Sequence, residues 1–80
     1  METVIVNGVC FAYQRDGSLI EIFDAAGCVV ADIVTSTASE QMYGTGYDEG
    51  DETPFDIPYF EFCEKSDSEL VEWAVASQLC

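Results

Sequence analysis

The chain has 80 residues and carries sixteen acidic side chains against two basic ones, with no histidine, so its formal net charge at pH 7 is −14. The two cations, Arg15 and Lys65, are too few to neutralise this charge or to hold an anionic ligand. Nucleic acid, phosphorylated substrates and anionic membranes are therefore disfavoured as direct partners, and a strongly basic surface is favoured. Neighbouring carboxylates on so small a domain repel one another even at physiological ionic strength, where the Debye length is about 8 Å.

Length and hydropathy predict a single compact domain over residues 1–80. Hydrophobic residues make up 49% of the chain, which is too many for a disordered acidic tail. No stretch approaches the roughly 18 apolar residues of a membrane span, and the start Met1-Glu2-Thr3 lacks the basic region of a secretory signal. We therefore expect a cytoplasmic protein, in the host cell cytoplasm if the chain is phage-encoded, with no membrane partner.

The four cysteines are widely spaced and form no C-x-x-C pair. In a cytoplasmic protein this pattern favours reduced, structural thiols over disulfides. Cys10 and Cys28 lie inside apolar runs, where we expect them to be buried as small hydrophobic residues. Cys80, at the end of the chain, is the cysteine that we expect to be most exposed.

The first half of the chain predicts an antiparallel β-meander. Three β-rich stretches follow one another, at residues 4–14, 19–23 and 28–34. Asn7-Gly8 favours a turn or bulge inside the first stretch, and Asp16-Gly17 is a strong hairpin signal before the second. Gly27 can take the left-handed conformation that the next short connection needs.

Residues 35–54 interrupt this pattern with serine, threonine, glycine and acidic residues. They predict a long acidic loop, which contains Gly44 and Gly46 and ends in the acidic run 48–52. A loop of this length is uncommon in a compact domain and is usually functional or disordered.

The end of the chain predicts an edge strand and a helix. Residues 55–63 fit a fourth strand, which Pro58 moves to a sheet edge or a bulge because proline cannot donate to a ladder. Ser66 and Glu69 match a capping box, and the apolar stripe that follows would dock a helix on the sheet. We therefore predict an α+β fold, an antiparallel four-stranded sheet (a meander plus an edge strand) with one C-terminal helix packed on one face. Which face the helix covers is left open.

The acidic loop and its surroundings are the candidate binding surface. Its carboxylates form a spaced array that suits the Lys and Arg residues of another protein. The candidate acidic partner-binding residues are Asp32, Asp48, Glu49, Asp51, Glu52, Asp56, Glu61 and Glu64. Tyr43, Tyr47 and Tyr59 are candidate interface anchors, because tyrosine is enriched in binding hot spots and tolerates partial exposure.

The sequence gives little support to a calcium site, a zinc site or a catalytic site. An EF-hand loop that started at Asp48 would have Gly50 at ligand position 3 and Thr53 at the glycine position, so the spacing fails. The scattered cysteines lack the short ligand pairs of zinc sites. Without histidine the chain has no imidazole base and no Ser-His or Cys-His nucleophile. We expect a protein that is not an enzyme, with no cofactor and no metal.

A small acidic domain with an α+β pattern and a loop of spaced carboxylates resembles the phage-encoded DNA mimics. This group includes anti-CRISPR proteins and the inhibitors of restriction enzymes and of uracil-DNA glycosylase. The resemblance implies that carboxylates replace backbone phosphates on a basic nucleic-acid-binding protein, and an anti-CRISPR protein acting on DNA or PAM recognition by a CRISPR effector complex is the member it favours.

Two other classes of protein remain open. A halophilic housekeeping domain would use its acidic residues for solubility, would unfold at low ionic strength and would have no specific partner. A structural or oligomerisation module would use an uncovered sheet face and an edge strand to assemble, and would form a defined oligomer without any basic partner.

Overall fold

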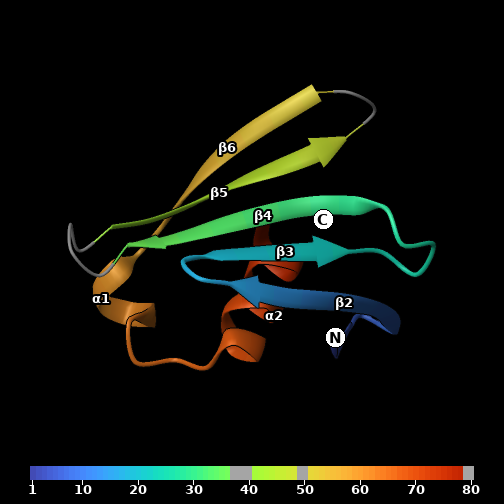
Figure 1. The fold of residues 1–80 in the computed structure, drawn as a ribbon, viewed down its shortest axis with the longest axis horizontal. Coiled ribbons are helices and arrows are strands. Elements are labelled where there is room, and N and C mark those ends of the chain that lie inside the picture. The colour runs from blue at the N-terminus through green and yellow to red at the C-terminus, as the bar shows by residue number, and fades with distance from the viewer. Residues whose placement is uncertain (37–40, 49–50, 79–80) are drawn as a thin grey trace.

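The computed structural model describes residues 1–36, 41–48 and 51–78. It is an α+β fold in which six antiparallel strands form one sheet in chain order and a helix follows at the C-terminal end (Figure 1). The strands are β1 (Glu2–Val6), β2 (Val9–Asp16), β3 (Leu19–Phe23), β4 (Val29–Ser36), β5 (Gln41–Asp48) and β6 (Asp51–Ile57). The helices are α1 (Tyr59–Phe62) and α2 (Asp67–Gln78). The antiparallel meander and the C-terminal helix are confirmed, but the predicted number of four strands is wrong.

The expected turns of the meander form where the sequence places them. Asn7 and Gly8 adopt φ angles of 52° and 81° between β1 and β2, a left-handed pair that matches the twist of a two-residue hairpin. Gly17, at φ 63°, follows β2, and Gly27, at φ 87°, precedes β4. The first β-rich stretch, residues 4–14, thus forms a complete hairpin, with the turn at Asn7-Gly8.

The prediction of a loop over residues 35–54 is wrong. β4 continues to Ser36, and β5 and β6 pair with each other as an antiparallel hairpin. Gly44 and Gly46 are the reason for the error, because glycine is rare in strands and marks loops in a single sequence. In the fold these two glycines lie on the buried face of β5, where the Phe55 ring covers Gly44 from the neighbouring strand.

The prediction of one strand over residues 55–63 is only half right. β6 ends at Ile57, and Pro58 occupies the N-cap position of α1 with φ −65°. Proline favours this change of structure because it cannot continue the ladder and its fixed φ suits a helix start. The predicted edge position is confirmed, since β6 is the last strand of the sheet.

The predicted capping box forms at the start of α2. The backbone N–H of Glu69 donates to Ser66 Oγ at 3.3 Å, and the backbone N–H of Ser66 donates to Glu69 Oε2 at 3.4 Å. Two backbone donors that a helix start leaves without partners are satisfied in this way. The helix therefore begins where the sequence pattern predicts.

α2 packs on one face of the sheet, which we name the helix-side face. Figure 1 shows α2 behind β2 and β3, and among the strands it packs mainly against β1. The buried strand residues of this face are Val6, Tyr13, Ile20, Ile22, Ala31, Ile33, Met42 and Ile57. α2 contributes Leu70, Val71, Ala74 and Val75, and α1 contributes Phe62. Among the described residues, no helix is long and apolar enough to cross a membrane.

Three cysteines lie outside this core. Cys10, Cys28 and Cys63 are exposed free thiols, so the prediction that Cys10 and Cys28 are buried is wrong. Cys10 lies on a strand of the sheet's outer hairpin with its position facing away from the helix, and Cys28 lies in the turn before β4. Cys80 falls outside the described residues.

Arg15 joins the sheet to the start of α2. Its Nε and Nη2 donate to Asp67 Oδ2 and Oδ1, each at 2.8 Å, and its Nη1 donates to the Thr35 hydroxyl at 3.1 Å. Hydrogen bonding to Arg15 lowers the pKa of Asp67 below its usual range, and Asp67 in turn raises the pKa of Arg15. One of the two cations of the chain is thereby neutralised within the fold.

We expect the substitution Asp67→Asn to make stability less dependent on pH at the acidic end. Because the folded-state pKa of Asp67 is lowered, its contribution is present above the unfolded value of about 3.9 and is lost as pH falls through the folded value. Both side chains are more than a third exposed, so screening limits the contribution to about 0.5–1 kcal/mol. The check is chemical denaturation from pH 7 to pH 2 beside Glu72→Gln, a control with the same charge change at an exposed position of α2. The difference between wild type and Asp67→Asn should shrink as pH falls below the unfolded value and be lost below the lowered pKa of folded Asp67, whereas a constant difference would contradict the ion pair.

Candidate binding surface

The face of the sheet opposite α2, which we name the open face, is not covered by the parts of the chain that the structure describes. Successive side chains of a strand point to opposite faces, so the ladder pairing assigns each residue to one of them. Five carboxylates fall on the open face, from four different strands: Asp16, Glu21, Asp32, Glu52 and Asp56. Neither cation lies among them, because Arg15 belongs to the helix-side face and Lys65 lies between α1 and α2.

Two of these carboxylates face each other directly at the centre of the sheet. Glu21 of β3 pairs with Asp32 of β4, and Thr45 of β5 continues the same row. Directly opposite residues have Cβ atoms about 4.5–5.5 Å apart, and like charges at this separation destabilise a sheet. Both side chains are only partly exposed, so water screens their repulsion incompletely. The fold therefore places two like charges opposite each other, although the packing of the sheet does not need a charged side chain at either position.

Tyr47 is tied to this pair. Its hydroxyl donates to Asp32 Oδ2 at 2.6 Å, across the β4–β5 ladder. The hydrogen bond to Asp32 raises the pKa of Tyr47 to about 12, with smaller contributions from burial and from Glu52 and Glu21. Tyr47 therefore stays protonated at all physiological pH values and holds the Asp32 carboxylate in one orientation.

A second row ends in two carboxylates with apolar residues between them. From β2 to β6 it contains Asp16, Leu19, Val34, Tyr43 and Asp56. Tyr43 is 49% exposed and lies directly opposite Asp56. The open face thus combines anionic groups with an aromatic side chain available for contact.

The structure brings together five of the predicted site residues and separates the others. Asp32, Tyr43, Tyr47, Glu52 and Asp56 share the open face. Asp48 pairs with Asp51 at the end of the β5–β6 hairpin, and these positions have the opposite parity to the open face. Glu61 and Glu64 are exposed on α1 and in the turn after it, Tyr59 is half-buried on α1, and Glu49 falls outside the described residues.

The prediction of partner-binding residues missed Asp16 and Glu21. Both lie in the predicted β-meander of the first half of the chain, away from the acidic run. The signal that identifies them is strand pairing, because Glu21 is opposite Asp32 and Asp16 shares a row with Asp56. These two residues can therefore be identified only when the pairing register of the five strands β2 to β6 is known.

Replacing Glu21 by glutamine should stabilise the protein. The substitution removes one charge of the Glu21–Asp32 pair and keeps the shape of the side chain, so the free energy of unfolding should rise by about 0.2–1 kcal/mol at low salt. Added salt should shrink the gain because it screens the repulsion. Glu2→Gln is the control, since its cross-strand partner Tyr13 carries no charge. A loss of stability in denaturant titrations of Glu21→Gln would contradict the account of this pair.

Within the described residues, no group of three or more cysteine and acidic side chains is arranged to hold a metal ion. The chain matches no protein-family model, no curated protein sequence and no solved structure.

Proposed function

We propose that the chain is an acidic inhibitor that mimics DNA and blocks the basic nucleic-acid-binding surface of another protein. The observation that carries the proposal is the open face, where five carboxylates from four strands lie beside exposed aromatic surface with no cation among them. Carboxylates placed on a rigid sheet can accept charge-assisted hydrogen bonds from Lys and Arg, as backbone phosphates do.

The unfavourable Glu21–Asp32 pair supports a binding role. A face selected only for solubility could spread its charges over positions where they do not oppose each other directly. When a basic surface binds, its cations lie beside both carboxylates and remove the repulsion between them. The relief of this repulsion would make the free energy of binding more favourable. Arg15 is paired with Asp67 on the helix-side face, so its positive charge does not offset the carboxylates of the open face.

A CRISPR effector complex is the partner class that we favour. Such complexes hold a nucleic-acid duplex in a positively charged channel and read the PAM with arginine side chains, so they offer both a basic groove and discrete cationic contacts. The proposed action is occupation of that surface in place of DNA, without contact between the chain and nucleic acid.

The test is displacement of DNA from purified CRISPR effector complexes with different PAM-reading domains. Fluorescent target duplex is bound to each complex, and the chain is titrated at about 50 and 200 mM salt, a range over which electrostatic binding weakens steeply. The proposal predicts release of the duplex by a stoichiometric complex of chain and effector, with weaker release at the higher salt. Failure to bind or displace DNA from any of them would refute the CRISPR assignment, and the same assay on restriction enzymes and uracil-DNA glycosylase then tests the wider mimicry.

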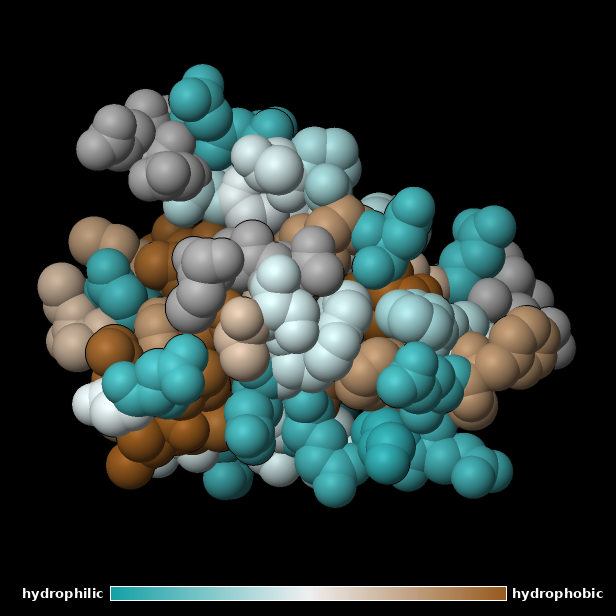
Figure 2. Space-filling view, turned by 180° about the vertical axis from the view of Figure 1, so that it is seen from behind, coloured by the Kyte–Doolittle hydropathy of each residue, from teal (hydrophilic) through white to brown (hydrophobic). Residues whose placement is uncertain are grey.

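An assembly role is the second candidate, because hydrophobic residues are exposed at one end of the sheet. Ile5 on the edge strand β1 is 69% exposed on the open face, and Val9, on the other strand of the same hairpin, is exposed on the helix-side face. Figure 2, which shows the helix side, has hydrophobic residues gathered at the end where Figure 1 places the β1–β2 turn. Self-association would bring together chains that each carry a charge of −14, which opposes it at low salt. Sedimentation equilibrium at low and high salt distinguishes the roles, since an assembly module forms a defined oligomer alone.

A further inference from the structure

The edge strand β1 points the backbone groups of every second residue away from the sheet. In an antiparallel ladder the N–H and C=O of successive residues point alternately to the two sides of a strand. The two-residue turn between β1 and β2 fixes this alternation, because its closing pair, Val6 and Val9, is hydrogen-bonded. Val4 therefore also bonds to β2, and Thr3 and Ile5 direct their N–H and C=O groups outward.

A backbone hydrogen bond elsewhere in the sheet gives the same alternation. The N–H of Thr35 donates to the carbonyl of Ser18 at 2.7 Å, between β4 and the start of β3. Counted through the registers of β3 and β2, this bond assigns the outward groups of β1 to Thr3 and Ile5 again. Among the described residues, no other backbone hydrogen bond reaches either of them. This edge thus has backbone donors and acceptors that the described fold leaves unpaired.

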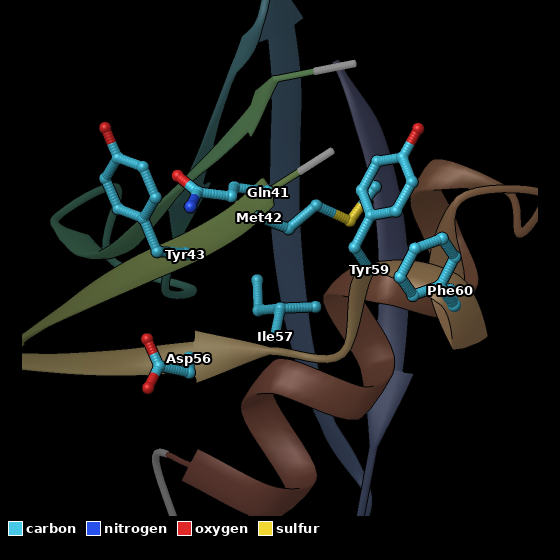
Figure 3. A pocket seen from close by; sticks show the side chains of 7 residues that line it. All are labelled: Gln41, Met42, Tyr43, Asp56, Ile57, Tyr59 and Phe60. Carbon is cyan, nitrogen blue, oxygen red and sulfur yellow. The ribbon is translucent and has the colours of Figure 1, made fainter. Parts of the chain in front are cut away.

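The opposite edge, β6, is protected against an added strand. The same count directs the backbone groups of Glu52, Pro54 and Asp56 outward. Proline has no N–H to offer, and charged residues on an edge strand also oppose further pairing. Figure 3, a close view of the pocket beside β5, β6 and α1, shows Asp56 and Ile57 on opposite faces of β6. The two edges therefore differ, and β1 is the one that suits an added strand.

β1 is also held in the extended conformation that an added strand needs. Val4 and Val6 pack with the core on the helix-side face, where α2 lies against β1. Neither outward residue is charged or a proline, and Ile5 is 69% exposed. An apolar side chain beside unpaired backbone groups gains free energy when a strand covers it. The β1 edge is therefore a preformed template without the features that protect β6.

We infer that the β1 edge binds an extended segment of the basic partner, which adds a strand to the sheet. The segment would exchange backbone hydrogen bonds with Thr3 and Ile5 and place an apolar side chain beside Ile5 on the open face. Charge favours this occupant over a second copy, because each copy carries −14 whereas the partner is basic. The inference rests on the proposed function, because that partner supplies the segment.

Short peptides test the edge without the partner, by NMR titration of the labelled chain. The probe is acetyl-Lys-Val-Lys-Val-Lys-amide, which would place its valines on the open face and bond through their N–H groups. Two isomers of equal charge carry N-methyl groups on both valines or on two lysines. The probe and the lysine-methylated isomer should shift the amide signals of Thr3 and Ile5 saturably, and the valine-methylated isomer should bind about tenfold more weakly. Equal binding of the two isomers would overturn the inference.

Hydrogen exchange of the free chain shows whether a second copy takes this edge instead. The amides of Val4 and Val6 should be protected, because they bond to β2, whereas those of Thr3 and Ile5 should exchange nearly as fast as in an unfolded chain. The measurement is repeated over a range of protein concentrations. Protection of Thr3 and Ile5 that increases with concentration would identify a second copy as the occupant and overturn the inference.

A pair of variants at Thr3 tests the edge in the DNA-displacement assay. Thr3→Pro removes an outward N–H and leaves the bonds to β2 intact, whereas Thr3→Val keeps that N–H. Thr3→Pro should need about fivefold more protein for half-displacement, and Thr3→Val should match wild type. Unchanged urea midpoints verify that both variants keep the fold. If wild type displaces DNA and the two variants displace it equally well, strand addition is wrong and the DNA mimicry stands. If wild type displaces no DNA, the proposed function is wrong, and the peptide titration still decides whether β1 accepts a strand.

Discussion

Replacing Gly44 by alanine should lower the free energy of unfolding by about 1–3 kcal/mol, the usual cost of inserting a methyl group into filled space. A Cβ at this position would lie 2.6 Å from Cε2 and 2.9 Å from Cε1 of the Phe55 ring, and closer still to Cζ. The ring cannot move freely, because it packs near Trp73 at a centroid distance of 6.4 Å, and Trp73 in turn contacts Phe62 at 4.9 Å. The added methyl group would therefore disturb the contact between the β5–β6 hairpin and the helices.

A double-mutant cycle identifies the ring as the cause. Urea denaturation is measured for wild type, Gly44→Ala, Phe55→Ala and the double variant. Once the ring is absent, the alanine should cost little, so the two substitutions should be strongly non-additive. Equal costs of Gly44→Ala with and without the Phe55 ring would show that the ring does not cover Gly44 in solution. That result would also contradict the β5–β6 register, which assigns the residues of the open face.

The sequence predicts local features of the fold well where one short pattern determines the backbone. Asn7-Gly8 and Gly27 adopt left-handed conformations because few other residues tolerate them, and the turns follow. The Ser66–Glu69 capping box forms because its hydrogen bonds are local. Such features depend on neighbours within a few residues and need no knowledge of the tertiary fold.

The β5–β6 hairpin could not be recognised in this way, because its stability comes from another part of the chain. Gly44 has no side chain to bury, and the space above it is filled by Phe55, eleven residues later. Tyr43, Thr45 and Tyr47 favour a strand on the opposite side, but three glycines and an acidic run outweighed that signal. Tertiary packing overrides local propensity at this point.

The candidate site was only partly predictable for a related reason. The acidic run drew attention to residues that are close in sequence, whereas the open face collects residues that are far apart in it. Asp16 and Asp56 share one row of the sheet although forty residues separate them. The net charge indicated a basic partner, and only the strand register indicates which carboxylates could meet it together.

Neutralising three carboxylates of the open face should reduce affinity for the basic partner about tenfold, since exposed ion pairs contribute about 0.2–1 kcal/mol each. The variant combines Asp16→Asn, Glu21→Gln and Glu52→Gln, three carboxylates from three different strands of the open face. The loss should appear partly as slower association, because long-range attraction steers the encounter, and mostly as faster dissociation, because direct contacts with Lys and Arg are removed. The variant should be as stable as wild type or more so, since it relieves the Glu21–Asp32 repulsion.

The control carries the same change of net charge at positions away from the open face. It combines Glu2→Gln on β1, Glu64→Gln after α1 and Glu72→Gln on α2, all exposed. If net charge alone attracts the partner, both triple variants should lose affinity equally. If the open face makes the contacts, the control should stay within about threefold of wild type, because only long-range steering is weakened.

The comparison of these two triple variants in the DNA-displacement assay tests the central claim most directly. Each is titrated against the effector complex with bound fluorescent duplex, in parallel with wild type and at one salt concentration. We expect the open-face variant to need about tenfold more protein for half-displacement, while the control stays close to wild type. Equal losses in the two variants, or a greater loss in the control, would show that the open face of the sheet is not the surface that replaces DNA.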